Sequence, residues 1–218
     1  RLPREYIFLN YLRCHDDIGW GLDYRWLMQF GIGEVSHKKY LNDFLTGQYP
    51  GSFARGELYN SDPVSGDARL CGTTASLCGI EKALYEKEEA ALEMAVRLDL
   101  MLHAYMFTQS GIPVIYSGDE IGQENDYTYH EDPDKQADSR YLHRGRFPWE
   151  LAEKRKEAGT VQERLFTGIG KLEEIRQSRE VFDGGADVWT LDNWEDSILG
   201  LARAKGGEKL VALFYFSE

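Results

Sequence analysis

The sequence predicts an α/β fold followed by a small antiparallel β-unit. Two short apolar runs, residues 6–13 (YIFLNYLR) and 113–117 (PVIYS), are typical of buried strands, and each ends abruptly in polar residues. A helical pattern lies between them, and a strand–helix–strand order indicates parallel pairing with a helical crossover. After residue 186 the hydrophobic pattern changes to period two, which indicates antiparallel strands.

The composition excludes two classes of partner. The 218 residues include 25 Lys and Arg against 37 Asp and Glu, a formal net charge of −12, so we expect no nucleic-acid partner. No apolar run approaches the ~20 residues of a membrane span, so we expect no membrane partner. Aromatic residues reach 13%, which fits a sugar-handling protein but fits an aromatic core more often.

The cysteines predict free thiols. Cys14, Cys71 and Cys78 are odd in number and form no CxxC pair, which argues against a disulfide framework and against a structural zinc site. Free thiols, with no visible signal peptide, favour a cytoplasmic location. The first residues, RLPRE, fit a mature N-terminus and an internal boundary of a longer chain equally well.

The connection between the two predicted strands begins with an irregular segment and ends with a helix. Residues 19–79 are glycine-rich, and connections of this length usually carry function; short helices are expected at 26–30 and 40–45. A long helix follows, which Gly111 and Pro113 end. Its predicted core-facing stripe consists of Leu84, Ala91, Ala95, Leu98, Leu102, Tyr105 and Gln109.

The second half of the chain contains another helix and three strands. Thr160 and Glu163 form the pattern of a capping box, and apolar residues continue from there at helical spacing. The strands are expected at 188–191, 197–204 and 209–216, with Gly206 and Gly207 as the hairpin turn between the last two. The stripe of this helix is Val161, Leu165, Ile169, Leu172 and Ile175.

Three polar clusters are candidates for chemistry. His15, Asp16 and Asp17 follow the first strand, where a carboxylate beside an imidazole can grip vicinal hydroxyls; a capped turn explains them equally well, and a metal site would need further ligands. Residues 118–140 are rich in acid; calcium is one reading, and a solvated acidic loop is favoured. Residues 143–146 (HRGR) fit buried or exposed ion pairs.

The run YLRCHDDIGW resembles the strand-seven motif of the α-amylase superfamily of glycoside hydrolases, and it is most similar to amylosucrases and sucrose hydrolases. The resemblance continues along the chain, in the family's order, through the segments HKKYLNDF, GSFARG, GDARLCGT, GIPVIYSGDEIG, KQADSRYLHRGR and RQSREVFDGG. The resemblance implies a retaining enzyme of carbohydrate metabolism that transfers or hydrolyses the α-glucosyl unit of sucrose, with no cofactor and no metal.

The resemblance also implies a (β/α)8 TIM barrel, of which this chain would be the last part. Residues 1–18 would hold strand seven and the active-site motif, and 19–79 a subdomain inserted over the mouth of the site. Residues 80–180 would hold helix seven, strand eight, a loop and helix eight, and 186–218 the truncated start of a C-terminal β-sandwich domain. The open strand edges would then need the missing barrel half or a second copy of the chain.

Five residues match functional positions of the family. Asp16 matches the carboxylate that stabilises the transition state, and His15 matches its companion on the 2- and 3-hydroxyls of the glucosyl ring. Asp17 and Arg69 match residues on the fructosyl side of sucrose. Arg144 matches an arginine that forms a salt bridge at the pocket floor.

The chain departs from the family in two ways. Lys38 replaces an arginine that helps to bind a glucan, Gly145 replaces a proline, and Cys14 replaces a serine. The nucleophile and the acid/base residue belong to strands four and five, so we expect the chain alone to be inactive. An α-glucosidase or α-amylase-type hydrolase of malto- or isomalto-oligosaccharides remains an alternative, as does a non-catalytic carbohydrate-binding fragment.

Overall fold

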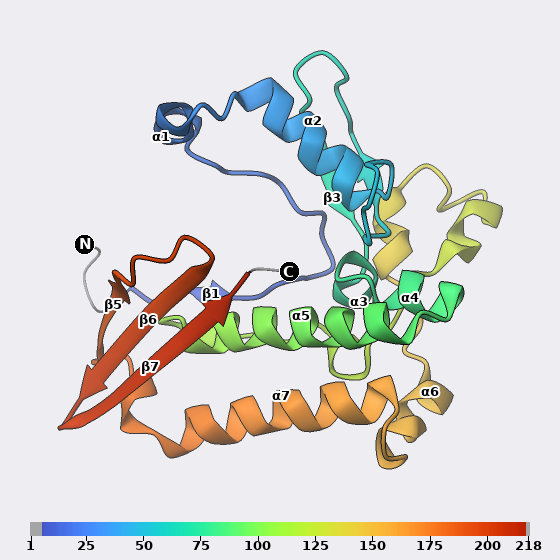
Figure 1. The fold of residues 1–218 in the computed structure, drawn as a ribbon. Coiled ribbons are helices and arrows are strands. Elements are labelled where there is room, and N and C mark those ends of the chain that lie inside the picture. Colours follow the sequence, from blue (N-terminus) through green and yellow to red (C-terminus); the bar gives the residue numbers. More distant parts are fainter. Residues whose placement is uncertain (1–5, 217–218) are drawn as a thin grey trace.

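The computed structural model describes residues 6–216, and two long helices form its centre. Helix α5 (Glu89–Thr108) and helix α7 (Val161–Ser178) lie side by side and run in the same direction (Figure 1). Near their N-terminal ends, Arg164 Nη2 lies 2.7 Å from a carboxylate oxygen of Glu93. The half-exposed Glu93–Arg164 ion pair therefore links the two helices near their N-terminal ends.

Strands β1 (Leu9–Asn10) and β4 (Ile112–Pro113) form a two-stranded parallel sheet. Parallel pairing with a helical crossover is confirmed, but both strands are shorter than the predicted 6–13 and 113–117. Within residues 6–216, each of these strands has one neighbouring strand. Regular backbone pairing is therefore limited to the two residues of each strand that lie opposite each other. The prediction that the first strand is buried is wrong, because the side chains of residues 6–9 are all more than half exposed.

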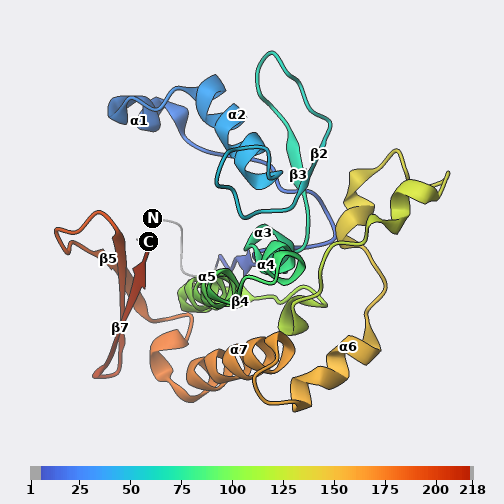
Figure 2. The same cartoon turned by 45° about the vertical axis from the view of Figure 1, so that its right-hand side comes forward.

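The segment 19–79 is more ordered than the sequence indicates. Both short helices expected there are present, and the second one begins earlier than predicted. An antiparallel hairpin, which was not predicted, follows them and pairs Leu58 with Leu70. The elements are α1 (Tyr24–Leu27), η1 (Met28–Phe30), α2 (Glu34–Leu45), β2 (Glu57–Tyr59), β3 (Arg69–Cys71) and α3 (Thr74–Leu77). This segment and α7 lie on opposite sides of α5 in both views (Figure 1, Figure 2).

The long helix predicted after residue 84 is two helices, α4 (Ile80–Glu86) and α5. Lys87 separates them, with a left-handed φ of 58°, and α5 ends at Thr108. The predicted core stripe is also wrong at most positions, since Ala91 is exposed and Leu98 and Leu102 are only half-buried. The side of α5 that is buried consists of Ala95, Val96, Asp99, His103, Met106, Phe107 and Thr108.

The buried face of α5 contains an aspartate and a histidine because the two side chains pair with each other. Asp99 and His103 are one helical turn apart, and Asp99 Oδ1 lies 2.9 Å from His103 Nδ1. A pattern search for apolar residues cannot recognise such a pair as core. It therefore assigns the buried face to the neighbouring leucines.

Helix α7 begins as predicted. The Thr160 hydroxyl accepts a hydrogen bond from the Glu163 backbone N–H at 3.1 Å, which is one half of a capping box. The Glu163 carboxylate accepts from Gly159 N–H at 3.4 Å, so the reciprocal bond goes one residue earlier than the motif implies. Leu165 and Ile169 of the predicted stripe are fully buried.

The C-terminal part is a three-stranded antiparallel sheet in the order β5 (Asp187–Leu191), β6 (Ile198–Lys205), β7 (Glu208–Tyr215). The predicted strands and the hairpin turn are confirmed, and Gly206 and Gly207 both have positive φ, as a type I′ turn requires. Whether this sheet begins a larger β-domain stays a prediction, as do the domain boundaries at 18, 79 and 180.

The remaining elements connect β4 to α7 and α7 to β5. They are η2 (Asp119–Ile121), η3 (Tyr127–Glu131), η4 (Ser139–His143), α6 (Trp149–Glu153), η5 (Lys154–Lys156) and η6 (Glu180–Phe182). Within residues 6–216, none of the helices has both the length and the apolar character that a membrane span needs.

Candidate functional site

Polar residues that follow β1 meet polar residues of η4 and its flanks, and we call residues 13–17 and 138–144 together the polar rim. Arg144 Nε donates to the backbone carbonyl of His15 at 2.7 Å. Asp16 Oδ1 lies 3.5 Å from Arg144 Nη2 and 3.6 Å from Arg140 Nη1. Asp138 holds Arg140 in turn, with 2.8 Å between Oδ1 and Nε. One carboxylate oxygen of Asp16 therefore faces two guanidinium groups.

The other carboxylate oxygen of Asp16 faces His15. Its Oδ2 lies 3.2 Å from His15 Nε2, and the two side chains are 52% and 72% exposed, respectively. An exposed pair of one acceptor and one N–H donor can bind two adjacent hydroxyl groups of a ligand. His15 and Asp16 are therefore candidates for contact with such a ligand.

Asp17 and Arg69 lie together beside this pair. Arg69 Nε is 3.7 Å from Asp17 Oδ2, and the arginine side chain is 56% exposed. Strand β3 brings Arg69 to this position, because Ile18 and Leu70 exchange two backbone hydrogen bonds of 2.9 Å. The five residues that the sequence singles out therefore lie in the polar rim or directly against it. They are His15, Asp16, Asp17, Arg69 and Arg144.

Two residues of the polar rim are buried, and neither is among the five site residues that the sequence singles out. Arg13 and His143 are 1% and 2% exposed. Arg13 Nη2 donates to the carbonyl of Asp16 at 2.8 Å and lies 2.8 Å from His143 Nδ1. His143 Nε2 is 3.2 Å from the carbonyl of His15. The pair therefore holds the backbone on which His15 and Asp16 are carried.

The protonation state of His143 suits this arrangement. Burial, and then the positive charge of Arg13, lower the pKa of His143 to about 3. The imidazole is therefore neutral near pH 7 and can accept a hydrogen bond from Arg13, whose Nη2 lies 2.8 Å from Nδ1 and 2.5 Å from Nε2. The sequence signal that could have identified the pair is the charge of Arg13 at the end of the mainly apolar run 6–13.

Lys38 is committed to ion pairs within the inserted segment. Its Nζ lies 2.6 Å from Glu34 Oε1 and 2.6 Å from Asp67 Oδ1, and its side chain is 10% exposed. The hydrogen bond to Asp67, and then the one to Glu34, raise the pKa of Lys38 above its usual value. In this arrangement Lys38 links α2 to the loop before β3 through ion pairs, and its ammonium group is directed at Glu34 and Asp67.

The acidic segment after β4 divides into two kinds of residue. Asp126 and Asp138 accept hydrogen bonds from backbone N–H groups at the start of η3 and η4, which is ordinary capping. Asp119 is different: it is only 5% exposed, so it does not belong to a solvated loop. For this residue the reading of the segment as a solvated acidic loop is wrong.

Asp119 joins the buried pair of α5. His103 Nε2 lies 3.9 Å from Asp119 Oδ2, and the histidine is completely buried. Burial, and then the charge of Asp99, raise the pKa of Asp119 to about 7. Burial alone would lower the pKa of His103, but the hydrogen bond and charge of Asp99 outweigh it and the pKa ends above the usual value. The three side chains of this cluster are at most 5% exposed.

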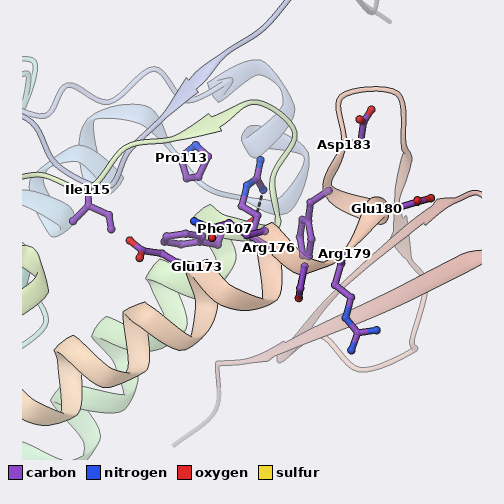
Figure 3. A pocket seen from close by; sticks show the side chains of 11 residues that line it. Phe107, Pro113, Ile115, Glu173, Arg176, Arg179, Glu180 and Asp183 are labelled. Atoms are coloured by element: carbon purple, nitrogen blue, oxygen red, sulfur yellow. Dashed lines mark hydrogen bonds between the residues drawn. The ribbon is translucent and has the colours of Figure 1, made fainter.

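A hollow of about 790 Å³ lies where the end of α7 meets β4 and η6 (Figure 3). Arg176 reaches across it and donates to the carbonyl of Phe107 and, at 3.2 Å, to that of Gln109. Its guanidinium therefore closes the C-terminal end of α5. None of the five predicted site residues lines the hollow, and we place the candidate site at the polar rim.

Comparison with known proteins supports the fold. No protein-family model matches the chain. Among solved structures, the chain is similar to sucrose 6F-phosphate phosphorylase from Thermoanaerobacter thermosaccharolyticum, with a TM-score of 0.58 and 18% sequence identity. The match covers 94% of this chain but 40% of that enzyme, so the chain spans less than half of the neighbour's length. At this identity the likeness shows a shared fold.

Proposed function

We propose that this chain forms part of the sugar-binding site of a retaining α-amylase-superfamily enzyme that transfers or hydrolyses the glucosyl unit of sucrose. The observation that carries the proposal is the geometry of the polar rim, where His15 and Asp16 present an exposed donor–acceptor pair beside Arg144. The solved structure with the same fold is a phosphorylase of a sucrose phosphate, which agrees with this substrate class.

The chemistry assigned to Asp16 follows from its charge. As the glycosidic bond breaks, the glucosyl ring gains oxocarbenium character, and a carboxylate that binds its hydroxyls attracts the ring more strongly than before. Arg140 and Arg144 hold Oδ1 and leave Oδ2 for the ring. Arg13 and His143 keep the backbone under the carboxylate in place, so the hydrogen bond needs no reorganisation during the reaction.

The retaining mechanism needs two more carboxylates, about 5–5.5 Å apart. We assign these to other strands of the complete barrel. Asp17 is occupied by Arg69, so it is a poor substitute for either. Exposed apolar side chains along the small sheet support the presence of further strands, since Leu9 is 63% and Ile112 51% exposed.

The Asp17–Arg69 pair favours sucrose among the α-glucosides. An arginine that is 56% exposed at the edge of a sugar site can donate to the hydroxyls of a second sugar ring, and its carboxylate partner holds it there. Such a pair matches the position that the family uses for the fructosyl unit. An α-glucosidase of malto- or isomalto-oligosaccharides has no fructosyl unit to bind, so its substrate would not explain the Asp17–Arg69 pair.

The test is an activity assay on the protein that contains this chain in a complete barrel, with sucrose, maltose and isomaltose as substrates. We expect turnover of sucrose with retention at the anomeric carbon. Arg69→Ala should reduce the preference for sucrose over maltose, while the exposed Arg97→Ala on α5 should leave it unchanged. Turnover of maltose without sucrose would favour the α-glucosidase, and sugar binding without any turnover would favour a non-catalytic protein.

A further inference from the structure

The loop that carries His15 and Asp16 also presents a cysteine. We propose that Cys14, His15 and Asp16 form a binding site for a thiophilic divalent cation of the zinc class. One ligand atom of each side chain, a sulfur, an imidazole nitrogen and a carboxylate oxygen, lies within 4.8 Å of the other two. The sequence had indicated only two of these donors, because the spacing alone does not show that the Cys14 thiol turns toward them.

The geometry is close to what zinc requires. Zinc bonds of about 2.0–2.3 Å place tetrahedral ligand atoms roughly 3.3–3.8 Å apart. The distance between His15 Nε2 and Asp16 Oδ2 is 3.2 Å, and one ligand atom of each of the three side chains lies within 4.8 Å of the other two. Cys14 Sγ accepts a hydrogen bond from the backbone N–H of Asp16 at 3.4 Å, which holds the sulfur next to this residue. Small rotations of three exposed or half-exposed side chains complete the set. Three protein ligands leave a fourth position for water, as in open zinc sites.

The binding step conserves charge and electrons. The Cys14 thiol gives its proton to solvent, its sulfur forms the bond to the cation, and nothing is oxidised or reduced. Asp16 supplies Oδ2, since Oδ1 faces Arg140 and Arg144. These two guanidinium groups repel a cation, so we expect an affinity in the micromolar range, weaker than that of a closed structural zinc site.

The other two cysteines cannot give the same signal. Cys71 and Cys78 are buried, and burial raises the pKa of Cys71 to about 12 and that of Cys78 well above its usual value. Metal–thiolate signals from the folded protein therefore report on Cys14. This makes a spectroscopic test specific.

The test is a titration of the folded 218-residue chain with Co²⁺, which gives a sulfur-to-metal charge-transfer band when a thiolate is a ligand. We expect the band at micromolar Co²⁺ and its loss on addition of Zn²⁺. Cys14→Ser should abolish the band, and His15→Gln should weaken Co²⁺ binding at least tenfold. His130→Gln, which removes another exposed histidine beside a carboxylate, is the matched control and should change nothing.

Circular dichroism of each variant verifies folding, and serine is a close replacement for the half-exposed Cys14. A band that persists in Cys14→Ser, or no Co²⁺ binding in the micromolar range by the folded wild-type chain, would overturn the inference.

A second experiment distinguishes this metal site from the proposed function. Any effect of the metal on catalysis rests on that proposed function. Because the same side chains would hold the sugar, sucrose or glucose should weaken Co²⁺ binding. Metal binding that sugar does not affect would support the metal site and count against the sugar role of His15 and Asp16. Sugar binding that requires Asp16, without any metal binding, would support the sugar role and overturn the metal site.

Discussion

The chain contains two histidine–aspartate pairs in opposite surroundings. In the polar rim, His15 and Asp16 lie 3.2 Å apart and are 72% and 52% exposed. On α5, His103 and Asp99 lie 2.9 Å apart and are both fully buried. The same two residue types at almost the same distance therefore serve a surface that can meet a ligand and a core that cannot.

The difference lies in where the spare hydrogen-bonding capacity goes. At the polar rim, Arg140 and Arg144 use one oxygen of Asp16, and solvent reaches the rest of the pair. In the core, His103 lies beside Asp99 and Asp119, and all three side chains are at most 5% exposed. Exposed ion pairs contribute little to stability, whereas a buried pair is costly to break. Substitutions in the buried pair should therefore lower the free energy of unfolding much more than substitutions in the exposed pair.

The largest expected effect is on folding. Asp99→Ala removes the counter-charge of His103 and leaves a buried polar group without it, which should lower the free energy of unfolding by about 3–5 kcal/mol. Urea denaturation followed by circular dichroism measures this. Glu93→Ala, which removes a half-exposed carboxylate of the same helix, is the control and should cost far less. Equal losses would show that the buried pair has no special role.

The next effect is on catalysis, in the complete enzyme of the proposed function. Asp16→Asn should lower kcat by about 100-fold or more with little change in KM, because the carboxylate binds the charged transition state better than the ground state. Steady-state kinetics on sucrose measures both constants. Asp192→Asn, at an exposed turn far along the chain, is the control. A change in KM alone would make Asp16 an ordinary substrate contact.

The pH dependence of stability should come from the buried cluster. The pKa of Asp119 is about 7 in the fold, above that of an unfolded aspartate, so its contribution is present at low pH and is lost as the pH rises from about 4 through 7. His103, whose pKa is also raised, loses its contribution above about 6.5. Unfolding free energies at pH 5, 6, 7 and 8 should therefore decline, and Asp119→Asn should flatten the decline below pH 7. An unchanged slope in the variant would assign the dependence to other groups.

The smallest effect is expected for the exposed pair. His15→Gln should change the free energy of unfolding by no more than about 0.5 kcal/mol, as is usual for surface substitutions. His103→Gln, the same substitution in the buried pair, should cost clearly more. Urea denaturation of the two variants side by side gives the comparison directly. A destabilised His15→Gln would mean that the polar rim supports the fold as well as binding a ligand.

Several elements of the fold follow from local sequence. The start of α7 at Thr160 and the hairpin at Gly206 and Gly207 were predictable, because caps and tight turns depend on neighbouring residues. The parallel pairing of β1 and β4 was predictable from the strand–helix–strand order along the chain. The proximity of His15, Asp16 and Asp17 was equally given by their adjacency in the chain.

The tertiary structure decided which polar residues are buried. Hydrophobic periodicity assigned the wrong face to α5, because Asp99 and His103 lie 2.9 Å apart on its buried side and Asp119 of η2 approaches His103 to 3.9 Å. In the same way, the burial of Arg13 depends on His143, which follows 130 residues later and lies within hydrogen-bond distance of its guanidinium. A sequence pattern records each residue's own polarity, whereas burial of a charge depends on a partner that only the folded chain brings within hydrogen-bond distance.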